Sequence, residues 1–270
     1  MDFKIALQLY SVRDFLEADF EGTVKKVKEL GYEGVEFAGL YGKTAKEVKA
    51  ICEKYDITPI SAHVPFTDMV ENPGLLEDYK EIGCEFVAIP YLTEEYRPGQ
   101  EKFAEVISGA KMLGEKAKSL GMKLVYHNHD FEFEKIDGEY ALDILYKEVP
   151  ADLLDPQLDT CWVNVGGENP AAYVEKYSGR VNILHLKDFA GGKSENMYAL
   201  IGIDENEEKN TGGKFEFRPL GKGVQNFPEI LAAAEKAGTK WVVVEQDSPS
   251  LNLTAMECAE ESIKYLKTII

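Results

Sequence analysis

The chain contains only four histidines, and their positions predict one shared site. His63, His127, His129 and His185 each stand at or just past the end of a short apolar run. If those runs are parallel strands, their carboxyl ends meet at one face of a sheet or barrel. Imidazoles gathered there can ligate a metal, move protons or bind substrate hydroxyls. We therefore expect a functional site at that face.

Carboxylates end three other runs at the same level. Glu36 lies in the second run, Asp159 directly follows the sixth, and Glu245 closes the eighth. A charged side chain at the end of a buried run must find a partner or reach solvent at the rim. Strand alternation puts Glu245 on the same face as Val243, and the same rule predicts that the carboxylates point inward.

One imidazole and two carboxylates from successive strands suit a divalent ion. In a closed barrel Asp159, His185 and Glu245 converge near the axis. Nitrogen and oxygen ligands of this kind bind Mn²⁺, Zn²⁺, Mg²⁺ or Co²⁺. A hydrogen-bonded network of histidine and carboxylates without a metal uses the same residue types, so the pattern alone leaves both interpretations open.

Eight β-rich runs alternate with helical segments along the 270 residues. The predicted strands are Ile5–Tyr10, Gly34–Phe37, Thr58–Val64, Phe86–Ile89, Lys123–Tyr126, Leu153–Leu158, Val181–Leu186 and Trp241–Val244. The predicted helices are Phe20–Leu30, Thr44–Tyr55, Asn72–Ile82, Gln100–Leu120, Glu139–Lys147, Pro170–Tyr177, Phe227–Ala237 and Thr254–Ile269. Eight alternations predict a single-domain (β/α)8 TIM barrel over residues 1–270. An open doubly wound sheet is the alternative, but no GxGxxG loop follows the first run.

One connection, residues 190–223, is too polar and glycine-rich for a helix plus a short loop. Long loops in compact domains often cover a binding site. A lid over the barrel mouth and a surface insertion are both compatible with this composition. The segment Leu220–Val224 contains two glycines and a lysine, and its backbone is a candidate cradle for an anion.

The charge balance excludes several classes of partner. The chain has 30 basic and 48 acidic residues, a formal net charge of −18, which repels nucleic acids and anionic membranes. No apolar run is long enough to span a membrane. The segment Met1–Leu9 has no signal-peptide layout, so we expect a cytoplasmic protein. The four scattered cysteines form no CxxC pair and are expected to be buried thiols.

Four segments resemble a known family. They are YHNHDFEF at residues 126–133, LDT at 158–160, LHLKD at 184–188 and VEQD at 244–247. Together they resemble the sugar phosphate isomerase/epimerase family of xylose isomerase-like TIM barrels, and the resemblance extends over essentially the whole chain. It implies a divalent metal held by His127, Asp159, His185 and Glu245. Many family members carry a glutamate where this chain has His127.

The resemblance also implies roles at the site. Glu245 would act as a proton acceptor, and His127 and Glu132 are further catalytic candidates. The substitution of His127 for a glutamate argues against a symmetrical shuttle between two glutamates. The candidate substrate-binding residues are His63, Glu36, His129, Trp162, Lys187 and Tyr10, with Lys187 either neutralising an oxyanion or pairing with a rim carboxylate such as Asp188.

We therefore predict a metal-dependent isomerase or epimerase acting on a small sugar, a sugar phosphate or a polyol. The alternative is a lyase or dehydratase acting on a keto-sugar, keto-glycoside or inosose, because both reactions begin by removing a proton beside a carbonyl. A non-catalytic sugar-binding barrel is the third interpretation. Endonuclease chemistry would need more ligands and a basic groove, which the sequence lacks. A homodimer is compatible with the sequence.

Overall fold

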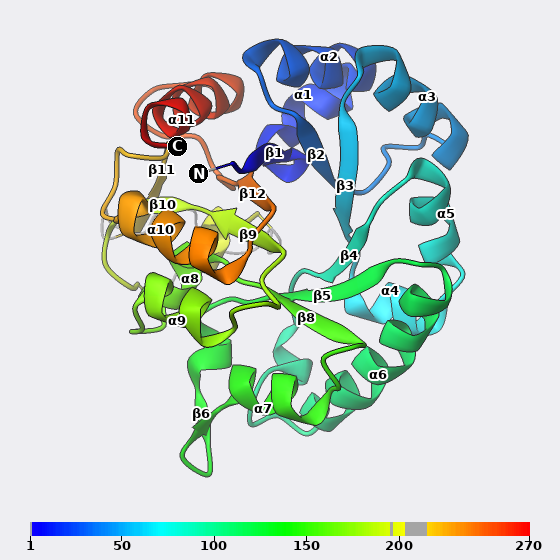
Figure 1. The fold of residues 1–270 in the computed structure, drawn as a ribbon, viewed down its shortest axis with the longest axis vertical. Coiled ribbons are helices and arrows are strands. Elements are labelled where there is room, and N and C mark those ends of the chain that lie inside the picture. Colours follow the sequence, from blue (N-terminus) through cyan, green and yellow to red (C-terminus); the bar gives the residue numbers. More distant parts are fainter. Residues whose placement is uncertain (1, 195–196, 203–214) are drawn as a thin grey trace.

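Eight parallel strands surround one axis in the computed structural model, which describes residues 2–194, 197–202 and 215–270 (Figure 1). The strands are β1 (Lys4–Gln8), β2 (Gly34–Ala38), β3 (Thr58–His63), β4 (Phe86–Ile89), β5 (Lys123–His127), β8 (Leu154–Gln157), β9 (Ile183–Leu186) and β12 (Trp241–Val244). They pair in the order β8-β5-β4-β3-β2-β1-β12-β9. A parallel bridge between Asp159 and His185 joins the two ends, so the predicted TIM barrel is confirmed.

Helices cover the outside of the strands (Figure 1). They are α1 (Arg13–Ala18), α2 (Phe20–Leu30), α3 (Ala45–Tyr55), α4 (Phe66–Glu71), α5 (Leu75–Ile82), α6 (Phe103–Ser119), α7 (Ala141–Glu148), α8 (Thr160–Val165), α9 (Pro170–Lys176), α10 (Phe227–Ala237) and α11 (Ala255–Ile269). Gly31 and Gly238 end α2 and α10 in the left-handed conformation, as a terminating glycine requires. Both helices match their predicted bounds.

Three short helices were absent from the sequence prediction. α1, α4 and α8 each have six residues and follow a strand at the carboxyl end of the barrel. Fewer than two turns give no recognisable helical periodicity. α8 begins because the Asp159 side chain accepts hydrogen bonds from the backbone N–H groups of Cys161 and Trp162.

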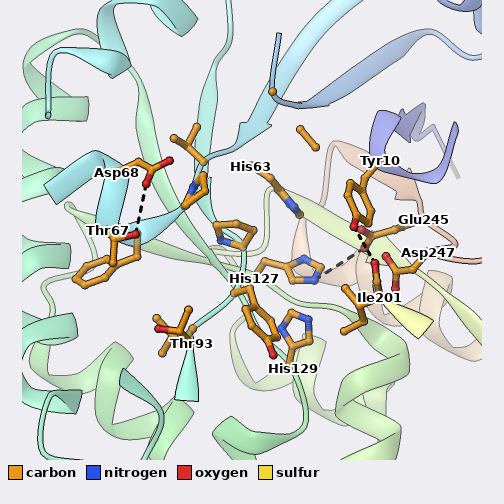
Figure 2. A pocket seen from close by; sticks show the side chains of 18 of the residues that line it. Tyr10, His63, Thr67, Asp68, Thr93, His127, His129, Ile201, Glu245 and Asp247 are labelled. Atoms are coloured by element: carbon orange, nitrogen blue, oxygen red, sulfur yellow. Dashed lines mark hydrogen bonds and ion pairs between the residues drawn. The ribbon is translucent and has the colours of Figure 1, made fainter. Parts of the chain in front are cut away.

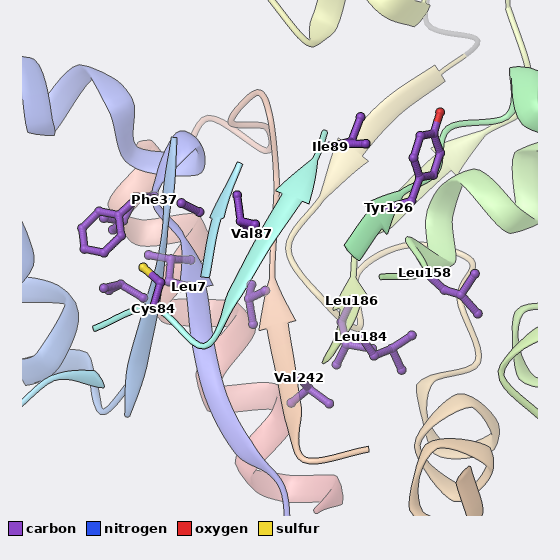
Figure 3. Packing of buried hydrophobic residues seen from close by; sticks show 14 of the residues in the cluster. Leu7, Phe37, Cys84, Val87, Ile89, Tyr126, Leu158, Leu184, Leu186 and Val242 are labelled. Carbon is purple, nitrogen blue, oxygen red and sulfur yellow. The ribbon is translucent and has the colours of Figure 1, made fainter. Parts of the chain in front are cut away.

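The side chains of each strand divide between two cores. Leu7, Val87, Leu184 and Val242 point outward and pack under the helices (Figure 3). The alternate residues fill the barrel, and we call them the lower layer: Ala6, Ile60, Phe86, Ala88, Val125, Ile183, Trp241 and Val243. This alternation confirms that Glu245, two residues beyond Val243, faces the barrel interior.

The connection after β9 contains an antiparallel hairpin of β10 (Asp188–Gly191) and β11 (Phe215–Arg218). An apolar cluster that includes Phe189, Phe215 and Phe217 lies beneath it. The remainder of the predicted 190–223 lid falls partly on residues 195–196 and 203–214, which lie outside the described residues, so its covering role stays a prediction.

All four cysteines are buried and unpaired. Within residues 2–194, 197–202 and 215–270, no helix is both long and apolar enough to cross a membrane.

Candidate active site

A polar layer lies directly above the lower layer, toward the carboxyl ends of the strands. We call it the upper layer, and it consists of Gln8, Glu36, His63, His127, Gln157, His185 and Glu245. On four strands its members stand two residues beyond a lower-layer side chain, which keeps them on the interior face. All of them are at most 9 % exposed, so each needs an internal partner.

The four predicted metal ligands come together at this level, three of them from the upper layer and Asp159 from the start of α8. His127, Asp159, His185 and Glu245 each offer one ligand atom, and these atoms all lie within 4.8 Å of one another. His127 Nε2 is 3.7 Å from Asp159 Oδ2 and 3.9 Å from Glu245 Oε2. These separations are too long for hydrogen bonds. They match the roughly 3–4 Å between ligand atoms that each stand about 2.1 Å from a shared ion.

A buried carboxylate oxygen in the cluster supports the same interpretation. Asp159 Oδ2 accepts no hydrogen bond, and the Lys187 ammonium stands 3.5 Å from it, whereas Asp159 Oδ1 accepts two hydrogen bonds from the start of α8. A buried carboxylate oxygen without a donor is costly unless a cation satisfies it. The donor set of two imidazoles and two carboxylates is one that first-row divalent ions accept. The residues present therefore fit a divalent metal.

His185 lies between two carboxylates. Its Nε2 donates to Glu36 Oε1 at 2.6 Å, and its Nδ1 donates to Glu245 Oε2 at 2.9 Å. Burial alone would lower the pKa of His185, but these two carboxylates raise it to about 10. Glu36 thus fixes the Nε2 proton, and Nδ1 faces the ligand cluster. Nδ1 would give up its proton on binding a metal, with the Glu36 carboxylate orienting the ring, as carboxylates orient metal-binding histidines.

Glu36 is the centre of the network behind the cluster, and it does not line the cavity. Gln8 and Gln157 donate to its two oxygens at 2.7 and 2.6 Å, and His63 Nε2 lies 3.0 Å from Oε1. Burial alone would raise the pKa of Glu36, but His63 and His185 hold it well below its usual range. Glu36, predicted to bind substrate, therefore positions His63 and His185 instead.

A buried lysine neutralises the carboxylates on one side of the cluster. Lys187 Nζ lies 2.7 Å from Asp247, 3.2 Å from Glu245 and 3.5 Å from Asp159. Burial would lower the pKa of Lys187, but these three acids hold it well above its usual range. The expected pairing of Lys187 with a rim carboxylate is therefore observed, but with these three acids and not with Asp188, because the side chains of Lys187 and Asp188 alternate and Lys187 points inward.

His127 and His129 both have pKa values that favour the neutral imidazole. Burial, followed by the charge of His185, holds the pKa of His127 well below its usual range. Burial, followed by Lys187, does the same for His129. The rings of His127 and His129 are 5.3 Å apart, and a buried nitrogen of each lacks a hydrogen-bond partner. Both imidazoles thus keep lone pairs for a ligand.

A cavity of about 620 Å³ opens onto this cluster. Tyr10, His63, His127, His129, Lys187, Glu245 and Asp247 line one side of it. Figure 2 shows the labelled members of this group together and Thr67, Asp68 and Thr93 on the opposite side. Tyr10 donates a hydrogen bond from its hydroxyl to the carbonyl of Ile201, so its ring forms part of the wall.

Glu132 and Trp162, like Glu36, lie outside the lining of this cavity. Glu132 is buried behind His129, where it accepts hydrogen bonds from the Tyr126 hydroxyl at 2.6 Å and the His129 backbone at 2.7 Å. Trp162 is fully buried, and its ring packs 5.1 Å from His129 and 6.0 Å from Phe215. Neither side chain lines the cavity, so the expectations of direct catalysis by Glu132 and of sugar stacking on Trp162 are corrected: both support His129 from behind.

The candidate anion cradle is already filled by the chain itself. The backbone N–H groups of Gly221 and Gly223 each donate to Asp188 Oδ2 at 2.9 Å. Gln225 N donates to Asp188 Oδ1 at 3.1 Å. The predicted use of Leu220–Val224 for a substrate anion is therefore wrong, because a carboxylate of β10 occupies those donors.

Sequence reasoning missed Gln8, Gln157 and Asp247. The alternation that placed Glu245 inside the barrel places Asp247 there as well, two residues further along. Gln8 and Gln157 end β1 and β8 in the same way. A glutamine at the end of a buried strand does not titrate and is rarely a metal ligand, so its residue type alone does not indicate a site.

Comparisons with known proteins agree with this architecture. The family described as "Xylose isomerase-like TIM barrel" matches residues 24–269. An inosose dehydratase of Clostridium beijerinckii is 25% identical, with 93% of this chain and 90% of the relative covered. The crystal structure of a Parabacteroides distasonis sugar phosphate isomerase/epimerase has a TM-score of 0.75 and 23% identity, covering 99% of this chain and 94% of that one. The IolI protein with a bound zinc atom has a TM-score of 0.74 and 17% identity, covering 99% and 98%.

Proposed function

The chain belongs to the xylose isomerase-like TIM barrel family, and from that premise we propose that it is a metal-dependent lyase. It removes a proton next to the carbonyl of a sugar or cyclic polyol and eliminates a substituent from the neighbouring carbon. The likeness to inosose dehydratases over most of the chain supports this reaction class. The ligand set His127, Asp159, His185 and Glu245 supports the metal requirement.

One observation carries the choice of elimination. The carboxylates that line the cavity beside the histidines, Glu245 and Asp247, both come from the end of β12. Across the cluster the cavity is lined by the imidazoles of His63 and His129. Epimerisation needs matched proton acceptors on both faces of the substrate, whereas an elimination can run on one face. The one-sided arrangement favours elimination.

Glu245 and Lys187, both on the β12 side of the cluster, can complete the elimination without a second acid. Glu245 takes the proton from carbon, the electron pair forms a C=C bond, and the C–O bond on the next carbon breaks. The leaving oxygen recovers the proton from Glu245 and departs as water or an alcohol. Lys187, 3.2 Å from Glu245, balances negative charge throughout. A divalent ion bound by the four ligands would polarise the carbonyl and acidify the adjacent C–H bond.

A second candidate is the isomerase or epimerase reaction of the sequence prediction. The structural likeness to sugar phosphate isomerase/epimerases favours it at the level of fold. Here the proton would return to carbon, and His129 is the group best placed to act on the opposite face, because its neutral imidazole lines the cavity.

Incubation of metal-loaded protein in D₂O with inososes, ketoses and 3-keto-glycosides separates the two reactions. Elimination gives an α,β-unsaturated ketone, detected by its ultraviolet absorbance, together with water or an alcohol. Recovery of a rearranged, deuterium-labelled sugar without an unsaturated product would instead establish the second candidate. Chelator-treated protein is the control and should lose either activity.

A further inference from the structure

The cavity continues well beyond the candidate site, toward α4 and the loop after β4. We call this extension the apolar arm, and it is lined by Val64, Phe66, Leu75, Tyr79, Leu92 and Tyr96. It opens directly onto His63 and His127, so one ligand can occupy both regions. Thr67, Asp68 and Thr93 lie on this side of the cavity, away from the catalytic cluster (Figure 2).

The size of the cavity exceeds what a single polyol ring fills. A molecule of liquid water occupies about 30 Å³, so a ring of about twelve non-hydrogen atoms needs less than roughly 360 Å³. The cavity measures about 620 Å³, within the range of roughly 300–1,000 Å³ that holds larger ligands. A substrate made only of one polyol ring would leave the apolar arm wet or empty.

The lining of the arm selects the chemistry of its occupant. The rings of Phe66 and Tyr96 lie edge to face at 5.5 Å, and Pro65 and Pro90 also border the cavity. Flat aromatic groups pack well against such walls and recover the free energy of apolar burial. Polar substituents on the far edge of an aromatic ring can form hydrogen bonds there with the hydroxyls of Thr67 and Thr93 and with the carboxylate of Asp68.

We propose that the substrate is an aryl glycoside whose sugar carries a ketone, with its aromatic aglycone in the apolar arm and its sugar at the cluster. This inference rests on the proposed function and names the leaving group. Glu245 takes the proton beside the ketone, the C=C bond forms, and the bond from the anomeric carbon to the aryl oxygen breaks. The aryl oxygen recovers the proton and leaves as a phenol, so the unsaturated keto-sugar and the phenol together balance the substrate.

Binding of unreactive glycosides tests the arm separately from catalysis. Phenyl β-D-glucoside, methyl β-D-glucoside and hexyl β-D-glucoside lack the ketone and bind without reacting. By calorimetry on metal-loaded protein, we expect phenyl glucoside to bind on the order of 50-fold more tightly than methyl glucoside. Saturation-transfer NMR should place its aromatic protons against the protein. Equal affinities for phenyl and methyl glucosides, or tighter binding of the hexyl compound, would overturn the proposal.

A substitution that fills the apolar arm tests whether the arm binds the aromatic ring. Leu75 is half-buried at the start of α5, and Leu75→Trp places a bulkier side chain in the arm. The variant should lose the preference for phenyl over methyl glucoside and keep its affinity for methyl glucoside within threefold. Leu251→Trp changes an exposed leucine outside the cavity and should retain the preference. An unchanged preference in Leu75→Trp would count against the arm as the aglycone site.

Turnover then distinguishes the two proposals. If keto-polyols eliminate water but phenyl 3-keto-glucoside reacts no better than methyl 3-keto-glucoside, the lyase stands and the aglycone site is rejected. If no ketone reacts while phenyl glucoside still binds through its ring and Leu75→Trp removes that binding, the aglycone site stands and the lyase is rejected.

Discussion

The lower and upper layers of the barrel interior are built on the same strands and have opposite chemistry. Val125 and Val243 belong to a layer of apolar side chains that need no polar partner. His127 and Glu245, two residues further along, belong to a layer in which charges and hydrogen bonds must balance. One step of strand alternation thus separates a region that stabilises the barrel from a region that can do chemistry.

In and beside the upper layer, positively and negatively charged side chains alternate, which offsets the cost of burying each charge. His185 stands between Glu36 and Glu245, and Lys187 stands between Glu245 and Asp247. Removing one member leaves a neighbour buried without compensation, which is more costly than the net contribution of an intact pair. Substitutions in the upper layer should therefore alter metal binding and activity, and substitutions in the lower layer should alter stability alone.

The largest effect is expected for Glu245→Gln. The amide cannot accept the substrate proton and ligates a metal poorly, so we expect turnover in the elimination assay to fall at least ~1,000-fold. The matched control is Glu85→Gln, an exposed carboxylate at the other end of the barrel, which should keep full activity. Intact turnover in Glu245→Gln would reject this residue as the proton acceptor.

Glu36→Gln should act through His185. The amide can no longer hold the Nε2 proton with a charged acceptor, so metal affinity should fall roughly 10- to 100-fold, the usual effect of losing such a partner. Competition with a fluorescent chelator measures the affinity, and activity should return at high metal concentration. Glu33→Gln, at the exposed start of β2, is the control. A metal affinity equal to wild type would mean that Glu36 does not orient His185.

Val243→Ala tests the lower layer. Deleting two buried methyl groups should reduce the free energy of unfolding by about 2 kcal/mol, from lost transfer free energy and the remaining void. Metal affinity and turnover per folded molecule should stay within twofold of wild type. Denaturant titration and metal titration of one sample test both expectations, and a large loss of metal affinity would show that the layers are coupled.

Glu132 offers a contrast, because it is a buried carboxylate outside the barrel with hydroxyl and backbone donors instead of a cation. Burial raises its pKa to about 8. The folded protein therefore holds a proton that the unfolded chain releases above about pH 4.3, and the stability from this group is lost as pH rises toward 8.

Glu132→Gln should remove the decrease in the free energy of unfolding that Glu132 causes as pH rises toward 8. Relative to wild type, the variant should gain up to about 1.4 kcal/mol per pH unit between about pH 5 and 8, and the difference should level off above pH 8. Urea titrations of both proteins across this range measure it, with turnover staying within threefold because Glu132 does not line the cavity. Parallel stability curves would show that Glu132 is ionised in the folded state.

The strands were predictable because each is a short apolar run bounded by turn residues. β4 and β12 match their predicted bounds, and each of the eight barrel strands lies within a few residues of its prediction, whereas the two short hairpins β6–β7 (Lys135–Ile136 and Glu139–Tyr140) and β10–β11 were not predicted. The inward direction of Glu245 followed from alternation alone. Helices of six residues, such as α4 and α8, escaped because their helical state depends on capping and packing at the barrel mouth, which periodicity does not report.

The convergence of the four metal-ligand candidates was also predictable, but the partners of the site residues were not. Four ligand candidates meet because neighbouring strands end at one face. Which acid pairs with Lys187 depends on the direction of its side chain and on Asp247, an acid the sequence reading passed over. Trp162 belongs to an apolar cluster that also contains Phe189, Phe215 and Phe217 of the β10–β11 hairpin, so its burial could not be predicted from its own strand–helix unit.

The carboxylate of Asp188 gives the loop after β11 a built-in occupant. Because it is attached to the chain, its effective concentration at the N–H groups of Gly221 and Gly223 exceeds that of any dissolved metabolite. A phosphorylated sugar would have to displace the Asp188 carboxylate before it could bind the same N–H donors. These N–H groups of the loop thus hold the hairpin in place, and they need no substrate anion to satisfy them.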